Sequence, residues 1–175
     1  MKEIKTARLL LRHIHESDAK DIFEYSKEPN VGPNAGWKPH DNIEETLQII
    51  KEAFVGKENV FGIVLKDSGK MIGSIGLIDD PRRNNPHAIM LGYAMSEHYW
   101  GKGLMTEAAL AIIEAAFCEL PIDIVSCTCY SSNPRSRRVI EKCGFQYEGC
   151  LHRAELCHDG KIMDLECYYL LKQLL

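Results

Sequence analysis

The sequence predicts a mixed α/β (α+β) fold, built as a single domain over residues 1–175. Two observations predict it. Short apolar runs typical of strands occur along the chain, and segments with apolar residues at helical spacing lie between them. Strands dominate the order at first, and two strand–helix units follow, so the order of elements is mixed. A chain of this length is sufficient for one well-packed core.

The first third of the chain predicts one strand and two helices. Residues 6–14 form an apolar run that reads as a strand, and Ser17 is placed to cap a helix that continues to about Tyr25. Residues 27–41 are rich in Gly, Pro and Asn, so we expect a loop. Asp41 then opens a second helix, whose apolar residues recur at helical spacing.

The middle of the chain predicts three strands. Residues 60–66 and 70–78 are strands joined by a turn at 67–69, residues 79–87 form a loop, and residues 88–95 form the next strand.

The last part predicts two helices, one strand and a hairpin. A long, mostly buried helix extends from about Gly103 to Cys118, and a strand follows at residues 123–130. A short helix at residues 134–143 has Asn133 in a capping position and ends before Gly144; the final hairpin turns at residues 158–161.

Composition narrows the class of protein. The net charge is −4 without a block of like charge, which argues against a nucleic-acid partner. No apolar run approaches the roughly 20 residues of a membrane span, and the start lacks the apolar core of a signal peptide. We therefore expect a cytoplasmic protein without a membrane partner. Seven cysteines in such a chain indicate reduced thiols rather than a disulfide framework.

The stretch WGKGLMTEA, residues 100–108, carries the clearest chemical signal. A helix start leaves several backbone N–H groups without partners, and the helix dipole adds partial positive charge there. Glycines let the backbone turn sharply and approach a ligand closely, which together makes an anion site suited to phosphates. Lys102 adds charge and Thr106 adds a hydroxyl. On these nine residues alone, a plain helix start remains an alternative.

Two known phosphate motifs do not fit this stretch. The Walker pattern GxxxxGK[ST] is absent. The dinucleotide fingerprint GxGxxG matches at Gly101 and Gly103 but then meets Thr106. Asp123 lies about 20 residues further on, yet it stands at the start of its strand, whereas the ribose-binding acid belongs near the far end.

Four segments in order resemble the GNAT superfamily of N-acetyltransferases, and more narrowly its RimJ/RimL-like branch. They are RLLLRHIHESDA, GYAMSEHYWGKGLMTEA, NPRSRRVIEKCGF and EGCLHRAELCHDGKIMDLECYYLL, and they span nearly the full chain. The resemblance implies one acyl-CoA N-acyltransferase domain with a central, mostly antiparallel twisted sheet flanked by helices. It also implies that the strand before the glycine turn splays from its neighbour, and that acetyl-CoA is the co-substrate, with no metal.

The resemblance assigns a set of residues to acetyl-CoA. In the family, backbone amides of the turn hold the pyrophosphate. The strand before the turn contacts the pantetheine arm, here at Met95, and the thioester carbonyl, here at Tyr93. Asn133 would contact the pantetheine, and Arg138 would contact a CoA phosphate. The turn residues are Gly101, Lys102, Gly103, Leu104, Met105 and Thr106. The family often has Gly or Ala where this chain has Met105, a change that leaves the backbone donor in place.

The resemblance also implies catalytic candidates. Ser136 is a candidate to protonate the departing thiolate; the alternative is an exposed serine in a first helical turn. The glutamate that many members carry before the turn is replaced by Met90, which cannot accept a proton. Glu155 is the favoured base, directly or through water, and an outward carboxylate paired with Arg153 is its alternative. His87 is the spare base, because the ordinary pKa of a histidine, near 6.5, suits that work.

The reaction that these residues imply is acetyl transfer from the thioester to a primary amine by direct attack in a ternary complex. Only a neutral amine attacks, and an α-amino group has a pKa of about 8 whereas a lysine is near 10.4. A modest base therefore suits a protein N-terminus, as in ribosomal-protein acetyltransferases; a polyamine, an amino acid or an antibiotic is the alternative acceptor. The loop with Asn34 and Trp37, together with His87, is expected to contact the acceptor. A homodimer is left open.

Two rival classes are weighed against this interpretation. A metal or redox protein is suggested by thiols and imidazoles in the last third of the chain, although no second ligand pair has zinc-finger spacing. These residues are Cys127, Cys129, His152, Cys157 and His158. A non-catalytic acyl-CoA sensor is suggested only by Met90.

Overall fold

The computed structural model describes residues 1–172. In this part of the chain, eight strands form one sheet in the order β1-β2-β3-β4-β5-β6-β8-β7. The strands are β1 (Ile4–Lys5), β2 (Leu9–Arg12), β3 (Val60–Leu65), β4 (Met71–Asp79), β5 (Ala88–Met95), β6 (Ile124–Tyr130), β7 (Gln146–Leu156) and β8 (Ile162–Leu171). Only the β5–β6 pair is parallel among these neighbours, so the expected mostly antiparallel sheet is confirmed.

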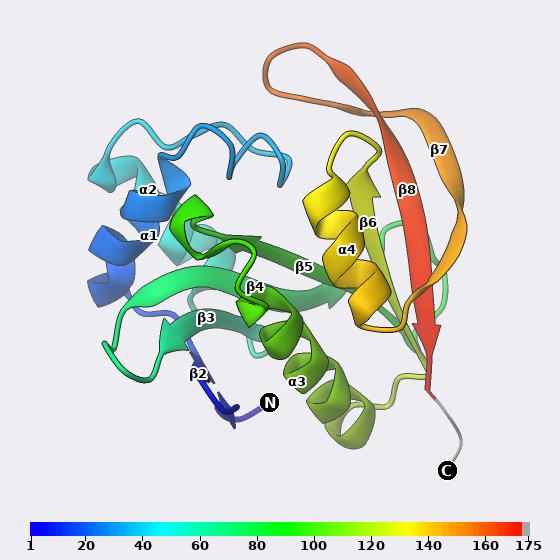
Figure 1. Cartoon of the computed structure of the whole chain (residues 1–175), viewed down its shortest axis with the longest axis horizontal. Helices are drawn as coiled ribbons and strands as arrows, with labels where there is room; N and C mark the ends of the chain where they lie inside the picture. Colours follow the sequence, from blue (N-terminus) through cyan, green and yellow to red (C-terminus); the bar gives the residue numbers. More distant parts are fainter. Residues whose placement is uncertain (173–175) are drawn as a thin grey trace.

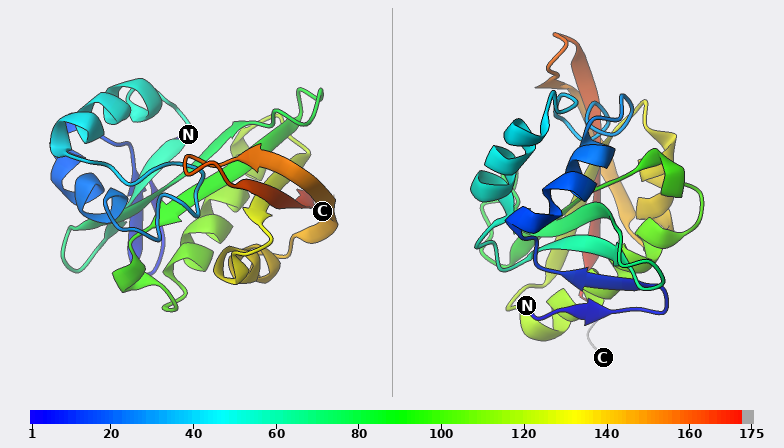
Figure 2. Two further views of the ribbon diagram at one scale, coloured as in Figure 1. Left: turned by 90° about the horizontal axis from the view of Figure 1, so that it is seen from above. Right: turned by 90° about the vertical axis from the view of Figure 1, so that its left-hand side faces the viewer.

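Four α-helices flank the sheet. They are α1 (Ala19–Ser26), α2 (Ile43–Ile49), α3 (Leu104–Glu119) and α4 (Pro134–Lys142). Two 3-10 segments lie at Glu16–Asp18 and Glu97–Tyr99, and a π-helical segment at Ile50–Phe54 continues α2. Figures 1 and 2 show α3 and α4 on one face of the sheet and α1 and α2 on the other.

Side chains alternate between the two faces of the sheet along each strand, and this produces two hydrophobic cores, one on each face. Ile63 and Ile72 point to the face that α3 covers, whereas their neighbours Val64 and Met71 point to the face of α1. The larger core packs the alanine-rich face of α3 against the sheet, and the smaller core packs Ile22 of α1 there. No helix within residues 1–172 is long and apolar enough to cross a membrane.

The N-terminal third departs in detail from the sequence-based expectations. The strand expected at residues 6–14 is shorter, covering only Leu9–Arg12, because the Thr6 hydroxyl and backbone bond to Leu9 and form a tight turn between β1 and β2. The N-cap of the 3-10 segment is His15 and that of α1 is Asp18, so Ser17 caps neither. Asn42, not Asp41, caps α2, since its side chain accepts the Glu45 N–H.

The feature that shapes the site is the divergence of β5 from β6. These two strands pair only from Ala88 with Ile124 to Leu91 with Cys127. Beyond that point β5 stays with β4 up to Met95, and β6 stays with β8 up to Tyr130. The last four residues of β5 therefore have no strand on the β6 side, as the expected splay requires.

Candidate active site

A cleft of about 360 Å³ lies where β5 and β6 diverge. Its walls come from the loop before α2, the end of β5, the glycine turn with the first turn of α3, and one face of α4. The lining residues are Val31, Asn34, Ala35, Tyr93, Ala94, Met95, Tyr99, Trp100, Gly101, Gly103, Leu104, Met105, Thr106, Asn133, Arg135, Ser136, Arg138, Val139 and Lys142. The structure thus brings together most residues that the sequence assigned to a CoA site.

The glycine turn has the backbone conformation that an anion cradle needs. Gly101 and Gly103 both have φ of +74°, in the left-handed region that side chains disfavour. Gly103 is also the N-cap of α3, and no side chain within the described chain caps this helix. The first N–H groups of a 16-residue helix therefore face the cleft, together with the positive end of its dipole.

Arg8 adds a charge to this turn from the other end of the chain. Its guanidinium donates to the Lys102 carbonyl at 3.0 Å and pairs with Glu107 of α3 at 2.7 Å. A Cβ atom built on Gly103 would lie 3.7 Å from Arg8 Nη2. Half of the Arg8 side chain stays exposed, so it is available to an anion at the turn. The sequence analysis did not predict Arg8 as a residue of the site.

Glu107 holds Arg8 in place. One carboxylate oxygen accepts from the Thr6 hydroxyl at 2.6 Å and from the Arg8 N–H at 2.8 Å. Although burial disfavours the charged form, the hydrogen bonds from Thr6 and Arg8 hold the pKa of Glu107 below its ordinary value. The carboxylate therefore stays charged and joins the turn before β2 to the start of α3.

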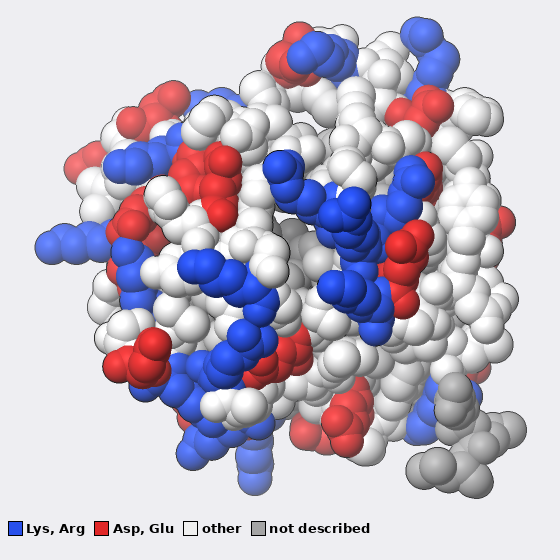
Figure 3. Space-filling view, in the orientation of Figure 1, with Lys and Arg blue, Asp and Glu red and all other residues white. Residues whose placement is uncertain are grey.

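Basic side chains also line the α4 wall. Arg135, Arg138 and Lys142 all line the cleft, and the Arg135 guanidinium lies 4.8 Å from the centre of the Trp100 ring. Figure 3 shows Lys and Arg side chains gathered around a hollow in this face. Lys102 does not line the cleft; its ammonium lies 5.1 Å from the Tyr99 ring centre. The rim is therefore positive in a protein whose net charge is −4.

The end of β5 presents a free donor to the cleft. Trp100 Nε1 donates to the Met95 carbonyl at 2.7 Å, whereas the next residue, Ser96, bonds back to Ile72 of β4. Residues alternate in direction along a strand, so Tyr93 and Met95 direct their backbone groups away from β4. Because the Met95 carbonyl already has a partner, its N–H is the group suited to a ligand.

Tyr93 and Ser136 meet across the cleft. The Tyr93 hydroxyl lies 2.8 Å from Ser136 Oγ and donates to the Ser136 carbonyl at 3.2 Å. Burial, and then the neighbouring thiol of Cys127, raise the pKa of Tyr93 well above its ordinary value, so the phenol keeps its proton. Ser136 faces the cleft and is not the exposed serine of the alternative interpretation.

Asn133 caps α4 and also lines the cleft. Its Oδ1 accepts the Ser136 N–H at 3.1 Å and so caps α4. The side chain also lines the cleft, which leaves the Nδ2 group as a donor toward a ligand.

Glu155 lies beside the cleft, outside its lining. A Cβ atom built on Gly36 would lie 3.4 Å from Glu155 Oε1 and 3.5 Å from the Tyr130 hydroxyl. Cys157 Sγ donates to the same hydroxyl at 3.7 Å. The hairpin of β7 and β8 thus approaches the loop next to Ala35, and the Glu155 carboxylate lies between them, half-buried.

Two expected acceptor contacts lie elsewhere. His87 precedes β5, and its Nδ1 lies 2.7 Å from the Pro121 carbonyl. The cleft begins near the other end of β5, so about 20 Å of strand separates His87 from Tyr93. His87 as spare base is therefore wrong. Trp37 packs against the smaller core with its ring tilted against that of His40, so it supports the loop, and Asn34 lines the cleft instead.

A helix N-terminus that faces two diverging strands, with a basic rim, defines a binding site for a phosphate-bearing ligand. The family model described as acetyltransferase (GNAT) domain matches residues 8–146. The chain belongs to this GNAT family and is an acetyl-CoA-dependent N-acetyltransferase.

Individual relatives agree with the family and with its RimJ/RimL-like branch. The uncharacterized N-acetyltransferase p20 of Bacillus licheniformis is 27% identical, over 99% of this chain and 98% of that protein. The [ribosomal protein uS5]-alanine N-acetyltransferase of Escherichia coli is 28% identical, over 83% of this chain and 79% of that protein. A GNAT-family acetyltransferase structure from Bacillus anthracis matches with a TM-score of 0.85 and 25% identity, over 97% and 98% of the two chains.

Proposed function

We propose that this enzyme transfers the acetyl group of acetyl-CoA to the α-amino group of a protein or peptide N-terminus. The acceptor half of the proposal rests on the carboxylate of Glu155, which lies beside Gly36 next to the cleft. The donor half rests on the glycine turn and the divergence of β5 from β6.

The residues of the cleft fit acetyl-CoA along its length. The N–H groups of the turn and Arg8 suit the pyrophosphate, and Arg138 suits a further phosphate. The Met95 N–H and Asn133 Nδ2 suit the amide groups of the pantetheine. The Tyr93 N–H then points to the position of the thioester carbonyl, where it stabilises the oxyanion that forms on attack.

The chemistry follows from this arrangement. The neutral amine attacks the thioester carbon and the carbon–sulfur bond breaks. Glu155, directly or through water, accepts the proton that leaves the amine nitrogen. Ser136 Oγ passes a proton to the departing thiolate and takes another from solvent, Glu155 returns its proton to solvent, and the Tyr93 hydroxyl orients the serine. The products are an amide and free CoA thiol.

The choice of an α-amine as acceptor rests on the pKa of the attacking amine. An α-amino group with a pKa of about 8 is already partly neutral at pH 7, whereas a lysine near 10.4 needs a stronger base or desolvation. The other carboxylates near this loop are engaged: Glu28 accepts from Ser96, and Glu97 accepts from Asn30. The relative that acetylates the uS5 alanine agrees with an N-terminal acceptor.

The test compares two peptides of one composition. Both carry one lysine; one has a free N-terminus and an acetylated lysine, and the other has an acetylated N-terminus and a free lysine. We expect release of CoA thiol and a mass increase of one acetyl group only with the free N-terminus. Spermidine, free amino acids and an aminoglycoside complete the panel.

Each outcome has one meaning. Preference for the free N-terminus supports the proposal. Turnover of the lysine peptide, or of a small amine in preference to both peptides, contradicts the α-amine acceptor while leaving acetyl transfer intact.

A further inference from the structure

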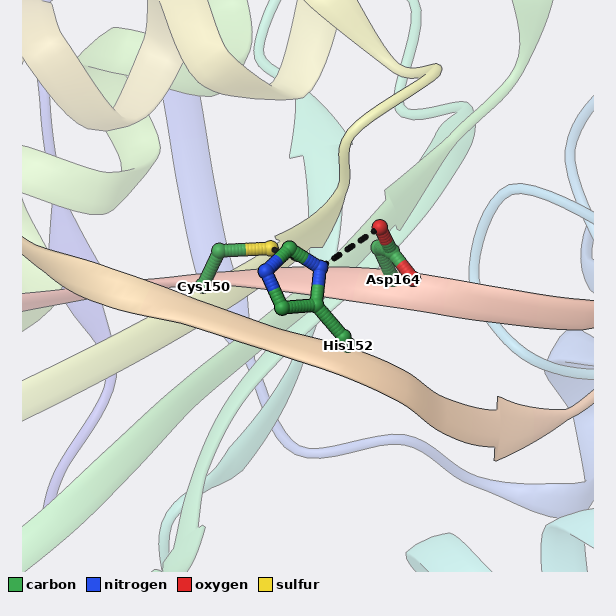
Figure 4. A group of neighbouring side chains, drawn as sticks. All are labelled: Cys150, His152 and Asp164. Carbon is green, nitrogen blue, oxygen red and sulfur yellow. Dashed lines mark hydrogen bonds and ion pairs between the residues drawn. The ribbon is translucent and has the colours of Figure 1, made fainter.

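Cys150, His152 and Asp164 form a compact cluster on the hairpin of β7 and β8, remote from the glycine turn (Figure 4). Their ligand atoms all lie within 4.8 Å of one another. Cys150 Sγ is 3.8 Å from His152 Nδ1, and Asp164 Oδ2 is 3.1 Å from the same nitrogen. One thiol, one imidazole and one carboxylate therefore lie close enough together to share one ion.

The sheet places these residues together. Cys150 and His152 are two apart on β7 and share a face. The register pairs Cys150 with Glu166 and Leu151 with Leu165, so Asp164 follows opposite His152. Glu166 itself is committed to Arg137 and to the Tyr168 hydroxyl. Asp164 is thus the carboxylate left on this face to join the thiol and the imidazole.

The distances match two edges of a tetrahedral metal site. Zinc binds sulfur at about 2.3 Å, nitrogen at about 2.0 Å and carboxylate oxygen at about 2.0 Å. Tetrahedral angles then separate sulfur from nitrogen by about 3.5 Å and nitrogen from oxygen by about 3.3 Å. The two measured distances to Nδ1 differ from these values by only a few tenths of an ångström.

The carboxylate is already oriented by a second contact. Asp164 Oδ1 accepts the Arg153 N–H at 2.7 Å, which directs Oδ2 toward His152. Arg153 has φ of +52°, at the irregularity that interrupts the β7–β8 register. Hydrogen bonds to the outer atoms of ligands are the usual means of fixing ligand geometry.

We propose that Cys150, His152 and Asp164 bind a divalent transition-metal ion, with zinc as the best fit. Thiolate and imidazole ligands select zinc and its neighbours in the first transition row over magnesium and calcium, which take oxygen ligands. Three protein ligands leave the fourth position to water. His152 is 79% exposed, so an ion enters without opening the fold.

A metal here links β7 to β8 beside the register irregularity. Glu155 follows His152 by three residues on β7, so the ion would fix the segment that carries the carboxylate of the acceptor end. The site is independent of acetyl-CoA binding and of the nature of the amine acceptor.

The experiment titrates the reduced, untagged protein with Co²⁺ and then displaces it with Zn²⁺. We expect one equivalent of Co²⁺ with a thiolate-to-cobalt charge-transfer band, lost on addition of Zn²⁺. Binding should weaken at lower pH, because protons compete for the thiolate and the imidazole. The band should disappear in Cys150→Ser, and His152→Ala and Asp164→Asn should each weaken binding by roughly tenfold or more.

Two substitutions on the same hairpin serve as controls. Cys157→Ser and His158→Ala remove a thiol and an imidazole outside the cluster and should leave the titration unchanged. In the wild-type protein, Zn²⁺ should protect Cys150 from alkylation but not the exposed Cys118. Three results would contradict the metal site: a band that survives Cys150→Ser, equal weakening of binding by the control substitutions, or absence of saturable binding. The cluster would then be only a contact between His152 and Asp164 with a thiol nearby.

Discussion

At the scale of single residues, the paired hydroxyls of Tyr93 and Ser136 are the most informative contact in the cleft. A serine held by a protonated phenol has a fixed orientation, which a surface serine lacks. Proton transfer by a positioned side chain contributes about 100-fold or more to a rate. The two residues should therefore differ in the size of their effect.

We expect Ser136→Ala to lower kcat by about 100-fold and Tyr93→Phe by about tenfold, with the dissociation constant of acetyl-CoA nearly unchanged. Steady-state kinetics and a CoA-binding titration measure the two quantities separately. Ser132→Ala, an exposed serine of the preceding turn, is the control and should behave as wild type. Full kcat in Ser136→Ala would remove this residue from the proton transfer.

Glu155→Gln should retain acetyl-CoA binding and lose rate most strongly at low pH. Above about pH 8 an α-amine is neutral without help, so the difference from wild type should shrink there. The measurement is the pH profile of kcat/KM with an N-terminal peptide. Asp159→Asn removes a carboxylate from the same hairpin, where Asp159 only pairs with Lys161, and should leave the profile unchanged. A constant loss at every pH would argue for a structural role of Glu155.

Residues close in sequence were predictable, and residues brought together by the fold were not. The glycine turn and Asn133 follow local rules of helix starts and caps, and both lie as expected. Arg8 was missed because its partner Glu107 is 99 residues away. His87 was misplaced because a strand's direction decides which of its ends meets the cleft. Cys150 and His152 share a face by strand alternation, but Asp164 required the register of the hairpin.

At the scale of elements, the junction between the β1–β2 turn and α3 determines where Arg8 lies. Replacing the Glu107 carboxylate by an amide removes its charge, weakens the hydrogen bonds from the Thr6 hydroxyl and the Arg8 N–H, and leaves Arg8 Nε facing an amide nitrogen that cannot accept. Hydrogen bonds to a charged group contribute about 1.5–3 kcal/mol each.

We expect Glu107→Gln to lower the free energy of unfolding by about 2 kcal/mol at pH 7. A carboxylate with a depressed pKa stabilises the fold above its unfolded pKa and loses that contribution as pH falls through its folded pKa. The deficit of the variant should therefore shrink as the pH falls below about 4.5, the ordinary pKa of the group.

Urea unfolding at pH 7 and at successively lower pH measures this difference. Glu114→Gln, an exposed glutamate of the same helix, is the control and should change stability little. Equal deficits in both variants would mean that Glu107 acts only through helix propensity or net charge.

Most elements followed from periodicity, and the exceptions have identifiable causes. The expected boundaries of α3 and α4 differ from the observed ones by one residue at most, because glycine and asparagine mark them. The strand at residues 6–14 was predicted too long, because the apolar pattern gives no sign of the turn between Thr6 and Leu9. The π-helical end of α2 keeps the apolar spacing of a helix, so the sequence could not distinguish it.

At the scale of the whole molecule, acetyl-CoA should act as a stabilising element, because it would lie between strands that the fold leaves apart. A ligand at 100 times its dissociation constant adds about 2.7 kcal/mol to stability. For a domain of this size that corresponds to a rise in Tm of roughly 5–10 °C.

We expect this rise in wild type and its loss in Gly103→Asp, whose carboxylate would both repel the pyrophosphate and pair with Arg8. Gly56→Asp is a matched control, because Gly56 has φ of +76° and open space around it. Both variants carry similar backbone strain, so both should melt slightly lower than wild type. A rise in Tm with acetyl-CoA in Gly103→Asp equal to that of the control would contradict phosphate binding at the turn.

The order of the strands in the sheet could not be predicted from the sequence. The mixed class and the final hairpin were predictable, but β8 inserts between β6 and β7 although it follows both in the chain. Local patterns do not encode which neighbour a strand selects; the packing of the complete sheet does.

The contact between Arg8 and Glu107 cannot form until both residues have been synthesised. At about 5–20 residues per second, the 99 residues between them separate their emergence from the ribosome by roughly 5–20 s. The glycine turn therefore reaches its final form only after α3 has been translated. Until then β2 can pair with β3 but has no α3 to cover it, so apolar surface of the sheet stays exposed on the nascent chain during that interval.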